Sequence, residues 1–335
     1  MRAVVLTGPE QAAVRTVPDP WPGEGEVLVA VEAVGICGTD LELWHGTMNY
    51  VREGRSTYPL IPGHEWTGTI MAVGGSSQGL RPGMRVVGET VIGCGTCRFC
   101  RARTPALCPQ RQEVGILGRP GALAEFLVVP ARTVHVLPVD RADIGVFAEP
   151  LAVAATAVGR LGRVGGRDVW VQGLGTLGTL AAGWAVLHGA RVFGSDIRDG
   201  RRTALERAGG QFVADWGSLA AEEPVLALEA SGSPAGLADL LRHVPPGSRV
   251  CLVGLPAPHR LDIAQVAFRH LELTGLIGSD PDLWGTVGDY LVRGLVAPTD
   301  WIALEVVSLD DIPDVLPRAA AGELTGKKVI CRIRG

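Results

Sequence analysis

A glycine-rich run between an apolar stretch and a helical stretch constrains the fold of this chain most strongly. Residues 173–178 read GLGTLG; they follow the apolar residues 169–172 and open the helix-like segment 176–187. In a G-x-G-x-x-G turn the first glycine allows a tight bend. The second lets the backbone approach a pyrophosphate, and the third lets the helix pack against the strand. The run therefore predicts a dinucleotide-binding turn.

The segments around this turn alternate between strand-like and helix-like patterns. Strands are expected at 169–172, 191–195, 225–229 and 249–253, and helices at 150–161, 176–187, 198–207 and 234–242. Such alternation produces a parallel sheet with helices on both faces. We therefore expect an α/β domain of the Rossmann type, built on a doubly wound parallel sheet.

An acidic residue and nearby arginines bear on the choice of cofactor. Asp196 ends the second expected strand, where a carboxylate meets the adenosine ribose hydroxyls and repels a 2′-phosphate. This position favours NAD over NADP, although Arg198, Arg201 and Arg202 leave NADP open. The residues expected to contact the cofactor are Gly173, Gly175, Thr176, Leu177, Gly178, Asp196 and Arg198.

The first half of the chain has a different pattern, with short strands separated by proline and glycine. Residues 26–34, 65–73, 85–91 and 124–129 are rich in β-branched residues and bounded by turn signals. Few helical periods occur before residue 140. We expect a compact, mostly antiparallel β domain, to which the strand-like segment 327–333 returns.

Four cysteines crowd into residues 94–108. Their spacing is C-x2-C-x2-C-x7-C, formed by Cys94, Cys97, Cys100 and Cys108. Four thiolates at such spacing surround one zinc ion tetrahedrally and leave no position open for a substrate. The cluster therefore predicts a structural zinc site.

A second set of potential metal ligands is dispersed along the sequence. Cys37 and His64 offer a thiolate and an imidazole, and either Glu65 or Glu149 could add an oxygen ligand. A catalytic zinc ion needs about three protein ligands and one open position. Glu149 precedes Pro150 at the expected domain junction, where ligand clefts commonly form.

Composition excludes several classes of function. The chain of 335 residues is 47% hydrophobic and 20% charged, as expected for soluble globular domains. A net charge of −4 argues against nucleic-acid and anionic-membrane partners. Apolar runs are short or broken by glycine, so we expect no membrane span and a cytoplasmic protein. Lysine occurs only at 327 and 328, a bias typical of GC-rich coding sequence.

Taken together, these motifs resemble the zinc-containing medium-chain dehydrogenase/reductase family over essentially the whole chain. The resemblance implies a co-chaperonin-like, β-rich catalytic domain at 1–147 and 282–335, and a Rossmann NAD-binding domain at 148–281. It implies two Zn²⁺ ions per chain, with Cys37 and His64 as catalytic ligands and the four clustered cysteines as structural ligands. It also implies a homodimer or a homotetramer.

Two glutamates narrow the resemblance. Glu149, in the sequence Glu-Pro-Leu, is similar to the polyol, threonine and glucose dehydrogenase branch, in which Glu65 or Glu149 binds zinc directly or through water. Many family members carry a proton-relaying histidine five residues after the ligand cysteine. Here that position is Glu42, as in sugar dehydrogenases. Glu42 could relay the proton or bind a substrate hydroxyl.

The implied reaction transfers hydride from a substrate alkoxide, formed at zinc, to the nicotinamide, while Thr39 accepts the hydroxyl proton. Segment 45–58 is expected to line the pocket with donors for a polyhydroxylated substrate: His45, Asn49, Tyr50, Arg52, Arg55 and Tyr58. We therefore expect a small hydroxylated substrate, namely a polyol, sugar or (amino)cyclitol with a secondary hydroxyl. The alternatives are a threonine- or butanediol-type dehydrogenase and a non-catalytic, zinc-stabilised binding protein.

Overall fold

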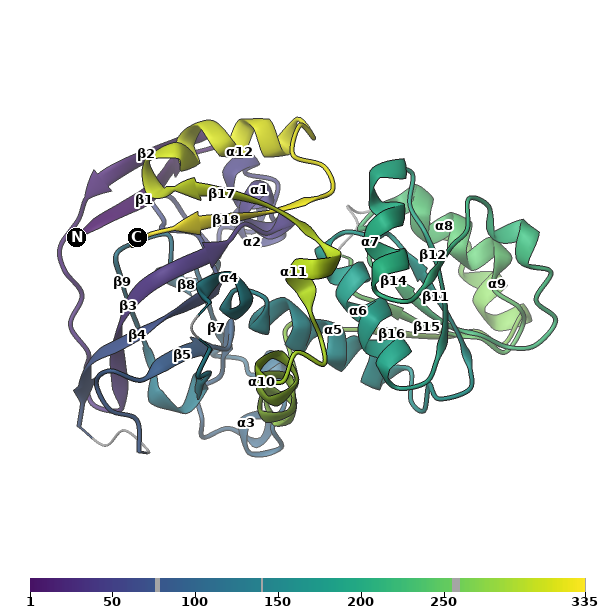
Figure 1. Ribbon diagram of the computed structural model, residues 1–335, viewed down its shortest axis with the longest axis horizontal. Helices are drawn as coiled ribbons and strands as arrows, with labels where there is room; N and C mark the ends of the chain where they lie inside the picture. Colours follow the sequence, from purple (N-terminus) through teal and green to yellow (C-terminus); the bar gives the residue numbers. More distant parts are fainter. Residues whose placement is uncertain (76–78, 140, 255–259, 335) are drawn as a thin grey trace. The chain divides into compact units, whose positions relative to one another are not determined.

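The computed structural model describes residues 1–75, 79–139, 141–254 and 260–334 (Figure 1). The chain forms two compact units. Unit 1 comprises Met1–Glu149, Asp280–Leu295 and Leu304–Gly335, and unit 2 comprises Pro150–Ser279 and Val296–Ala303.

Unit 1 is built on one large sheet with strand order β10-β5-β4-β3-β18-β17, in which β9 also pairs with β3. The strands are β3 (Glu26–Gly35), β4 (Glu65–Gly74), β5 (Arg85–Gly88), β9 (Phe126–Pro130), β10 (Val134–Val136), β17 (Ala303–Ser308) and β18 (Lys327–Arg332). Strand β3 pairs antiparallel with β4, β9 and β18. The mostly antiparallel β domain and the return of the C-terminal strand are therefore confirmed.

Smaller elements complete unit 1. The remaining strands are β1 (Arg2–Gly8), β2 (Gln11–Thr16), β6 (Val91–Ile92), β7 (Gln112–Val114) and β8 (Gly118–Arg119). The helices are α1 (Gly38–His45), α2 (Asn49–Arg52), α3 (Arg98–Arg101), α4 (Ala142–Gly145), α10 (Trp284–Val292) and α12 (Ile312–Ala320). The valines of β3 are buried in the core together with Trp66 and Ile70 of β4. Helix α1 was not predicted, because eight residues give little helical periodicity.

Unit 2 contains a six-stranded sheet of order β13-β12-β11-β14-β15-β16, and its strands are parallel (Figure 1). The strands are β11 (Asp168–Gln172), β12 (Arg191–Ser195), β13 (Gln211–Phe212), β14 (Leu226–Glu229), β15 (Arg249–Leu252) and β16 (Glu272–Gly275). The helices are α5 (Ala148–Arg160), α6 (Thr176–Leu187), α7 (Arg202–Arg207), α8 (Pro234–His243), α9 (Ile263–Phe268) and α11 (Pro298–Trp301). The predicted Rossmann arrangement is confirmed; the two edge strands, β13 and β16, were not predicted.

The glycine-rich turn joins β11 to α6, and sterics explain two of its glycines. Gly173 has φ +90°, and a Cβ there would lie 2.5 Å from the backbone of Ser231. A Cβ on Gly178 would collide with the carbonyl oxygen of Gly173. A side chain at Gly178 would therefore push helix α6 away from the turn, and one at Gly173 would collide with the backbone that follows β14.

Two features of the chain differ from the sequence-based description. Residues 296–303, expected in the catalytic domain, cluster with unit 2, where Trp301 packs so closely on Gly183 that a Cβ there would collide with the indole. Residues 142–160 are long and apolar enough to span a membrane, but 72% of the stretch that qualifies is buried inside the fold. Such burial is typical of a core helix.

Candidate metal centres and cofactor site

The four clustered cysteines come together around helix α3. Their sulfur atoms all lie within 4.8 Å of one another, and Sγ of Cys97 is 3.6 Å from Sγ of Cys100. Four zinc–sulfur bonds of ~2.3 Å in a tetrahedron give sulfur–sulfur separations of about 3.8 Å. The cluster therefore fits a zinc ion, and the cysteines are free thiols.

Local backbone groups prepare this cluster for a metal ion. The Cys97 N–H donates to Sγ of Cys94 at 3.4 Å, and the Cys94 N–H donates to Sγ of Cys108 at 3.3 Å. Hydrogen bonds, first from the backbone of Thr96, lower the pKa of Cys94 to about 5. Burial raises the pKa of Cys100 to about 12, so a metal ion has to displace its proton.

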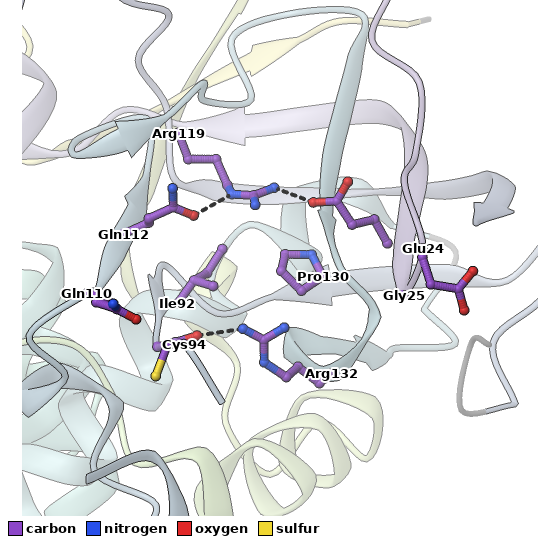
Figure 2. Close-up of a pocket in the computed structure, with 11 residues that line it drawn as sticks. Glu24, Gly25, Ile92, Cys94, Gln110, Gln112, Arg119, Pro130 and Arg132 are labelled. Atoms are coloured by element: carbon purple, nitrogen blue, oxygen red, sulfur yellow. Dashed lines mark hydrogen bonds and ion pairs between the residues drawn. The ribbon is translucent and has the colours of Figure 1, made fainter. Parts of the chain in front are cut away.

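A polar cavity of about 300 Å³ adjoins Cys94 (Figure 2). Its charged groups are largely paired with the protein: Arg119 donates to Glu26 at 3.0 Å and to Gln112 at 3.3 Å. Arg132 donates to the carbonyl of Gly93 at 2.5 Å. Arg132 therefore anchors the residue before Cys94, and none of the predicted catalytic residues lines the cavity.

The second metal centre is assembled by the sheet of unit 1. One ligand atom each from Cys37, His64 and Glu65 lies within 4.8 Å of the other two. The register explains this, because Gly35 at the end of β3 lies opposite Glu65 at the start of β4. Cys37 follows two residues after Gly35, and His64 immediately precedes β4. A thiolate, an imidazole and a carboxylate are suitable ligands for zinc, so the residues fit the ion.

Asp40 orients this centre, a role that the sequence analysis missed. It is completely buried, and its carboxylate accepts the N–H of Cys37 at 2.9 Å and of Gly63 at 3.0 Å. Nδ1 of His64 lies 3.6 Å from Oδ1 of Asp40, which leaves Nε2 for a metal ion. At 3.6 Å this contact is an ion pair and not a hydrogen bond. A carboxylate that accepts a hydrogen bond from a metal-binding histidine would fix its ring. The one sequence feature that pointed to Asp40 was its place three residues after Cys37.

The opposite charges of His64 and Asp40 shift the pKa values of both groups. Burial opposes the charged form of both groups, but each favours the charge of the other. The pKa of His64 is consequently raised well above its ordinary value, and that of Asp40 is lowered. Binding of a metal ion at His64 would release the proton from the nitrogen that becomes the ligand.

Glu149 lies near the centre but outside the three-residue group. Its Oε1 accepts a hydrogen bond from the hydroxyl of Thr90 at 2.8 Å. Burial raises its pKa, an effect opposed by His64 and reinforced by Glu65. The structure thus brings Cys37, His64 and Glu65 together, and Glu149 is not part of this group.

Lys328 is the second residue that the sequence analysis missed. It is 2% exposed, forms an ion pair with Glu65, and donates to the carbonyl of Ile36 at 2.9 Å. The only signal was a lysine followed by apolar residues in a strand-like segment, in a chain with two lysines.

The predicted proton-relay residues lie on helix α1. Thr39 and Glu42 are both half-buried. Burial raises the pKa of Glu42, and the charge of Arg52 lowers it. Arg52 on α2 is therefore close enough to influence Glu42 electrostatically.

The predicted substrate-binding donors of segment 45–58 are mostly used within the protein. Tyr50 donates to Glu113 at 2.9 Å, and Tyr58 donates to the carbonyl of Leu43 at 2.5 Å. His45 contacts Glu10, and Arg55 donates to Glu53. Of the six, Asn49 and Arg52 are exposed and have no such bond among the described residues.

The cofactor residues of unit 2 converge at the glycine-rich turn. Oδ2 of Asp196 accepts the N–H of Leu174 at 2.7 Å and lies 3.2 Å from Arg201. Arg198 reaches Asp196 through its backbone N–H at 3.0 Å. Glu229, which was not predicted, is fully buried at the end of β14, and burial raises its pKa.

Comparison with known proteins places this chain in a family. Residues 23–139 match the family described as "Alcohol dehydrogenase GroES-like domain", and residues 176–293 match "Zinc-binding dehydrogenase". The L-threonine 3-dehydrogenase of Chelativorans sp. (strain BNC1) is 34% identical over 354 residues, covering 98% of each chain.

Solved structures agree with this assignment. A zinc-binding dehydrogenase from Sinorhizobium meliloti 1021, bound to NADP, is 30% identical, with 99% of each chain covered and a TM-score of 0.87. Galactitol-1-phosphate dehydrogenase from Escherichia coli is 25% identical, with 99% and 100% covered and a TM-score of 0.88. The chain therefore belongs to the zinc-dependent medium-chain dehydrogenases of the alcohol dehydrogenase family, oxidoreductases that use zinc and a nicotinamide cofactor.

Proposed function

We propose that this enzyme oxidises a secondary hydroxyl of a polyol, sugar or (amino)cyclitol to a ketone, with two zinc ions per chain and NAD. The observation that carries the proposal is the group of the half-buried Cys37 with the buried His64 and Glu65, and with Asp40 beside the histidine. When bound, the zinc ion at this centre lowers the pKa of the substrate hydroxyl, and the nicotinamide accepts a hydride.

The chain itself supplies binding, orientation and a proton path. Cys37, His64 and Glu65 hold the metal ion, and Asp40 fixes the imidazole ring. Thr39 accepts the hydroxyl proton and passes it toward solvent through Glu42. Because a half-buried glutamate has a raised pKa, Glu42 is suited to exchange protons closer to neutral pH than an exposed one.

The preference for NAD rests on Asp196, whose carboxylate would repel a 2′-phosphate. Arg201 lies 3.2 Å from this carboxylate and partly neutralises it. We therefore expect NAD to be preferred and NADP to be used detectably. The kcat/KM with NAD divided by the kcat/KM with NADP should fall when Asp196 is changed to asparagine.

The polar substrate is proposed from Glu42, in the middle of α1, and Arg52, the last residue of α2. Glu42 offers an acceptor and Arg52 a donor, which together suit neighbouring hydroxyl groups. The second candidate is a small amino alcohol of the threonine type, favoured by the name of the 34% identical relative. Glu42 would then bind an ammonium group.

The test is elemental analysis of the purified protein combined with cofactor reduction over a panel of polyols, cyclitols, threonine and simple secondary alcohols. We expect two zinc ions per chain and NADH formation with polyols. Cys37→Ala should lose one ion and all turnover, whereas Cys251→Ala, a buried cysteine of unit 2, should lose neither. Turnover by zinc-free Cys37→Ala would refute the proposal, and turnover with threonine alone would select the second candidate.

A further inference from the structure

Two consecutive lysines of strand β18 have opposite environments. Lys327 is exposed and forms a surface ion pair with Glu305 at 2.7 Å. Lys328 points to the opposite face of the strand, as period-two alternation requires, and is buried in unit 1. These are the two lysines of the whole chain, so one of them lies inside the catalytic unit.

The sheet brings Lys328 and Glu65 together across Gly35. Strand β3 lies between β4 and β18; Gly35 is opposite Glu65 on one side and Ile330 on the other. A Cβ on Gly35 would lie 2.8 Å from Cε of Lys328 and would collide with Glu65. The missing side chain at Gly35 therefore leaves the space that the ion pair occupies.

The ammonium group of Lys328 contacts one candidate metal ligand and the backbone beside another. It pairs with Oε2 of Glu65 and donates to the carbonyl of Ile36, the residue before Cys37. A buried ion pair is a weak source of stability compared with apolar residues of similar size. A role in the chemistry of the centre explains the pair better.

The orientation of Glu65 is the property that this pair controls. A carboxylate binds a metal ion through one oxygen or through both. A second oxygen on the ion would take the position that a catalytic zinc site keeps open for a substrate. Oε2 of Glu65 forms the ion pair with Lys328, although it accepts no hydrogen bond among the described residues. A metal ion held with Cys37 and His64 would therefore meet Glu65 through its other oxygen.

We propose that Lys328 is a positioning residue that restricts Glu65 to one-oxygen coordination and so keeps a position at the zinc ion open for the substrate hydroxyl. The proposal rests on the proposed function, since it assumes a metal ion at Cys37, His64 and Glu65. Lys328 acts through Glu65 and does not touch the substrate.

The test uses the whole enzyme with Co²⁺ in place of zinc, because visible absorption by Co²⁺ is strong for four ligands and weaker for five. We expect Lys328→Met to retain two metal ions, to absorb more weakly, and to lose about 10–100-fold in turnover, as changes behind a metal ligand do. Lys327→Met is the matched control and should match the parent enzyme in both readouts.

A double-mutant cycle tests whether Lys328 acts through Glu65. In a Glu65→Gln background, adding Lys328→Met should leave the Co²⁺ spectrum unchanged, because no carboxylate remains to be restrained. The Glu65→Gln, Lys328→Met pair also removes both buried charges, so it tests the proposal even where Lys328→Met alone does not fold.

The outcomes separate the two proposals. An unchanged spectrum in folded Lys328→Met, or a change caused by Lys328→Met in the Glu65→Gln background, would overturn the role of Lys328 alone. A parent enzyme that takes up one metal ion, at the cysteine cluster, would instead overturn the proposed function.

Discussion

The two candidate metal centres of this protein are built in opposite ways. The cysteine cluster takes its ligands from one continuous segment, residues 94–108, and is prepared by hydrogen bonds within that segment. The other centre takes Cys37, His64 and Glu65 from the ends of strands β3 and β4, and Lys328 from β18. A closed shell of four like ligands can form locally. An open site with mixed ligands needs a sheet to position it.

This difference predicts which property each centre controls. A locally closed centre ties its loop to the domain, so its loss should reduce stability. A centre assembled by the sheet rests on strands whose own core packing is extensive. Loss of its ligands should therefore remove chemistry and leave the fold.

The largest effect is expected for Cys100→Ser, because it opens the closed shell. Loss of a bound metal ion belongs to the mechanisms that cost about 4–5 kcal/mol, which corresponds to a fall in Tm of roughly 8–20 °C. Thermal unfolding together with zinc content measures this. Ser218→Ala in unit 2 serves as a control, and a Tm equal to that of the parent enzyme with one zinc ion lost would show that the cluster is dispensable.

Cys37→Ala should produce the opposite result. We expect complete loss of turnover and of one zinc ion, with a change in the free energy of unfolding of about 1 kcal/mol or less, because the residue is only partly buried. Circular dichroism, thermal unfolding and metal analysis on the same sample measure the three properties. A collapse of Tm as large as that of Cys100→Ser would abolish the distinction between the centres.

Asp40→Asn should have a smaller effect on the open centre. The amide keeps the size of Asp40 but loses one charge and offers N–H donors where the N–H groups of Cys37 and Gly63 need acceptors. We expect about a 10–100-fold loss of turnover with weaker zinc binding, and retention of the structural ion. Zinc release to a chelator, followed for both ions, measures this; equal acceleration at the two centres would contradict it.

The contrast between the centres also explains what the sequence could predict. The spacing of the four clustered cysteines alone predicts how they surround a metal ion. The run GLGTLG predicts a tight turn, in which Gly173 and Gly178 are needed for steric reasons. Both motifs could be interpreted without knowing the fold. The Rossmann sheet was predictable for the same reason, because its strands and helices alternate locally.

The residues that support the open centre could not be found in this way. Lys328 is 263 positions after Glu65, and their contact depends on the register of β18, β3 and β4. Asp40 was visible in the motif, but its partners, Gly63 and His64, come from another segment. The donors of segment 45–58 were misjudged for a related reason: Tyr50 and Tyr58 are used by Glu113 and Leu43, which no local pattern reveals.

An open centre, unlike a closed one, also needs a path for protons. Substitution of Glu42 should reduce turnover less than substitution of Cys37 or Asp40, and its effect on the pH profile tests this path. Glu42 must be ionised to accept a proton, so turnover should fall as the pH drops through its pKa. Because burial raises this pKa, the fall should begin at a higher pH than for an exposed glutamate. Glu42→Gln should cost a few-fold at neutral pH and remove this acidic limb from the profile of kcat against pH.

Substitution of Arg52 should shift the acidic limb of the same pH profile in a defined direction. Its positive charge lowers the pKa of Glu42, so Arg52→Met should move the acidic limb to higher pH without removing it. Arg55→Met, in the same segment but paired with Glu53, should leave the limb in place. A limb that survives in Glu42→Gln would assign the proton path to another group. If Arg52→Met leaves the acidic limb at the same pH, Arg52 does not influence the pKa of Glu42, and the proposed polar substrate site loses support. None of the three substitutions should change zinc binding at the cysteine cluster.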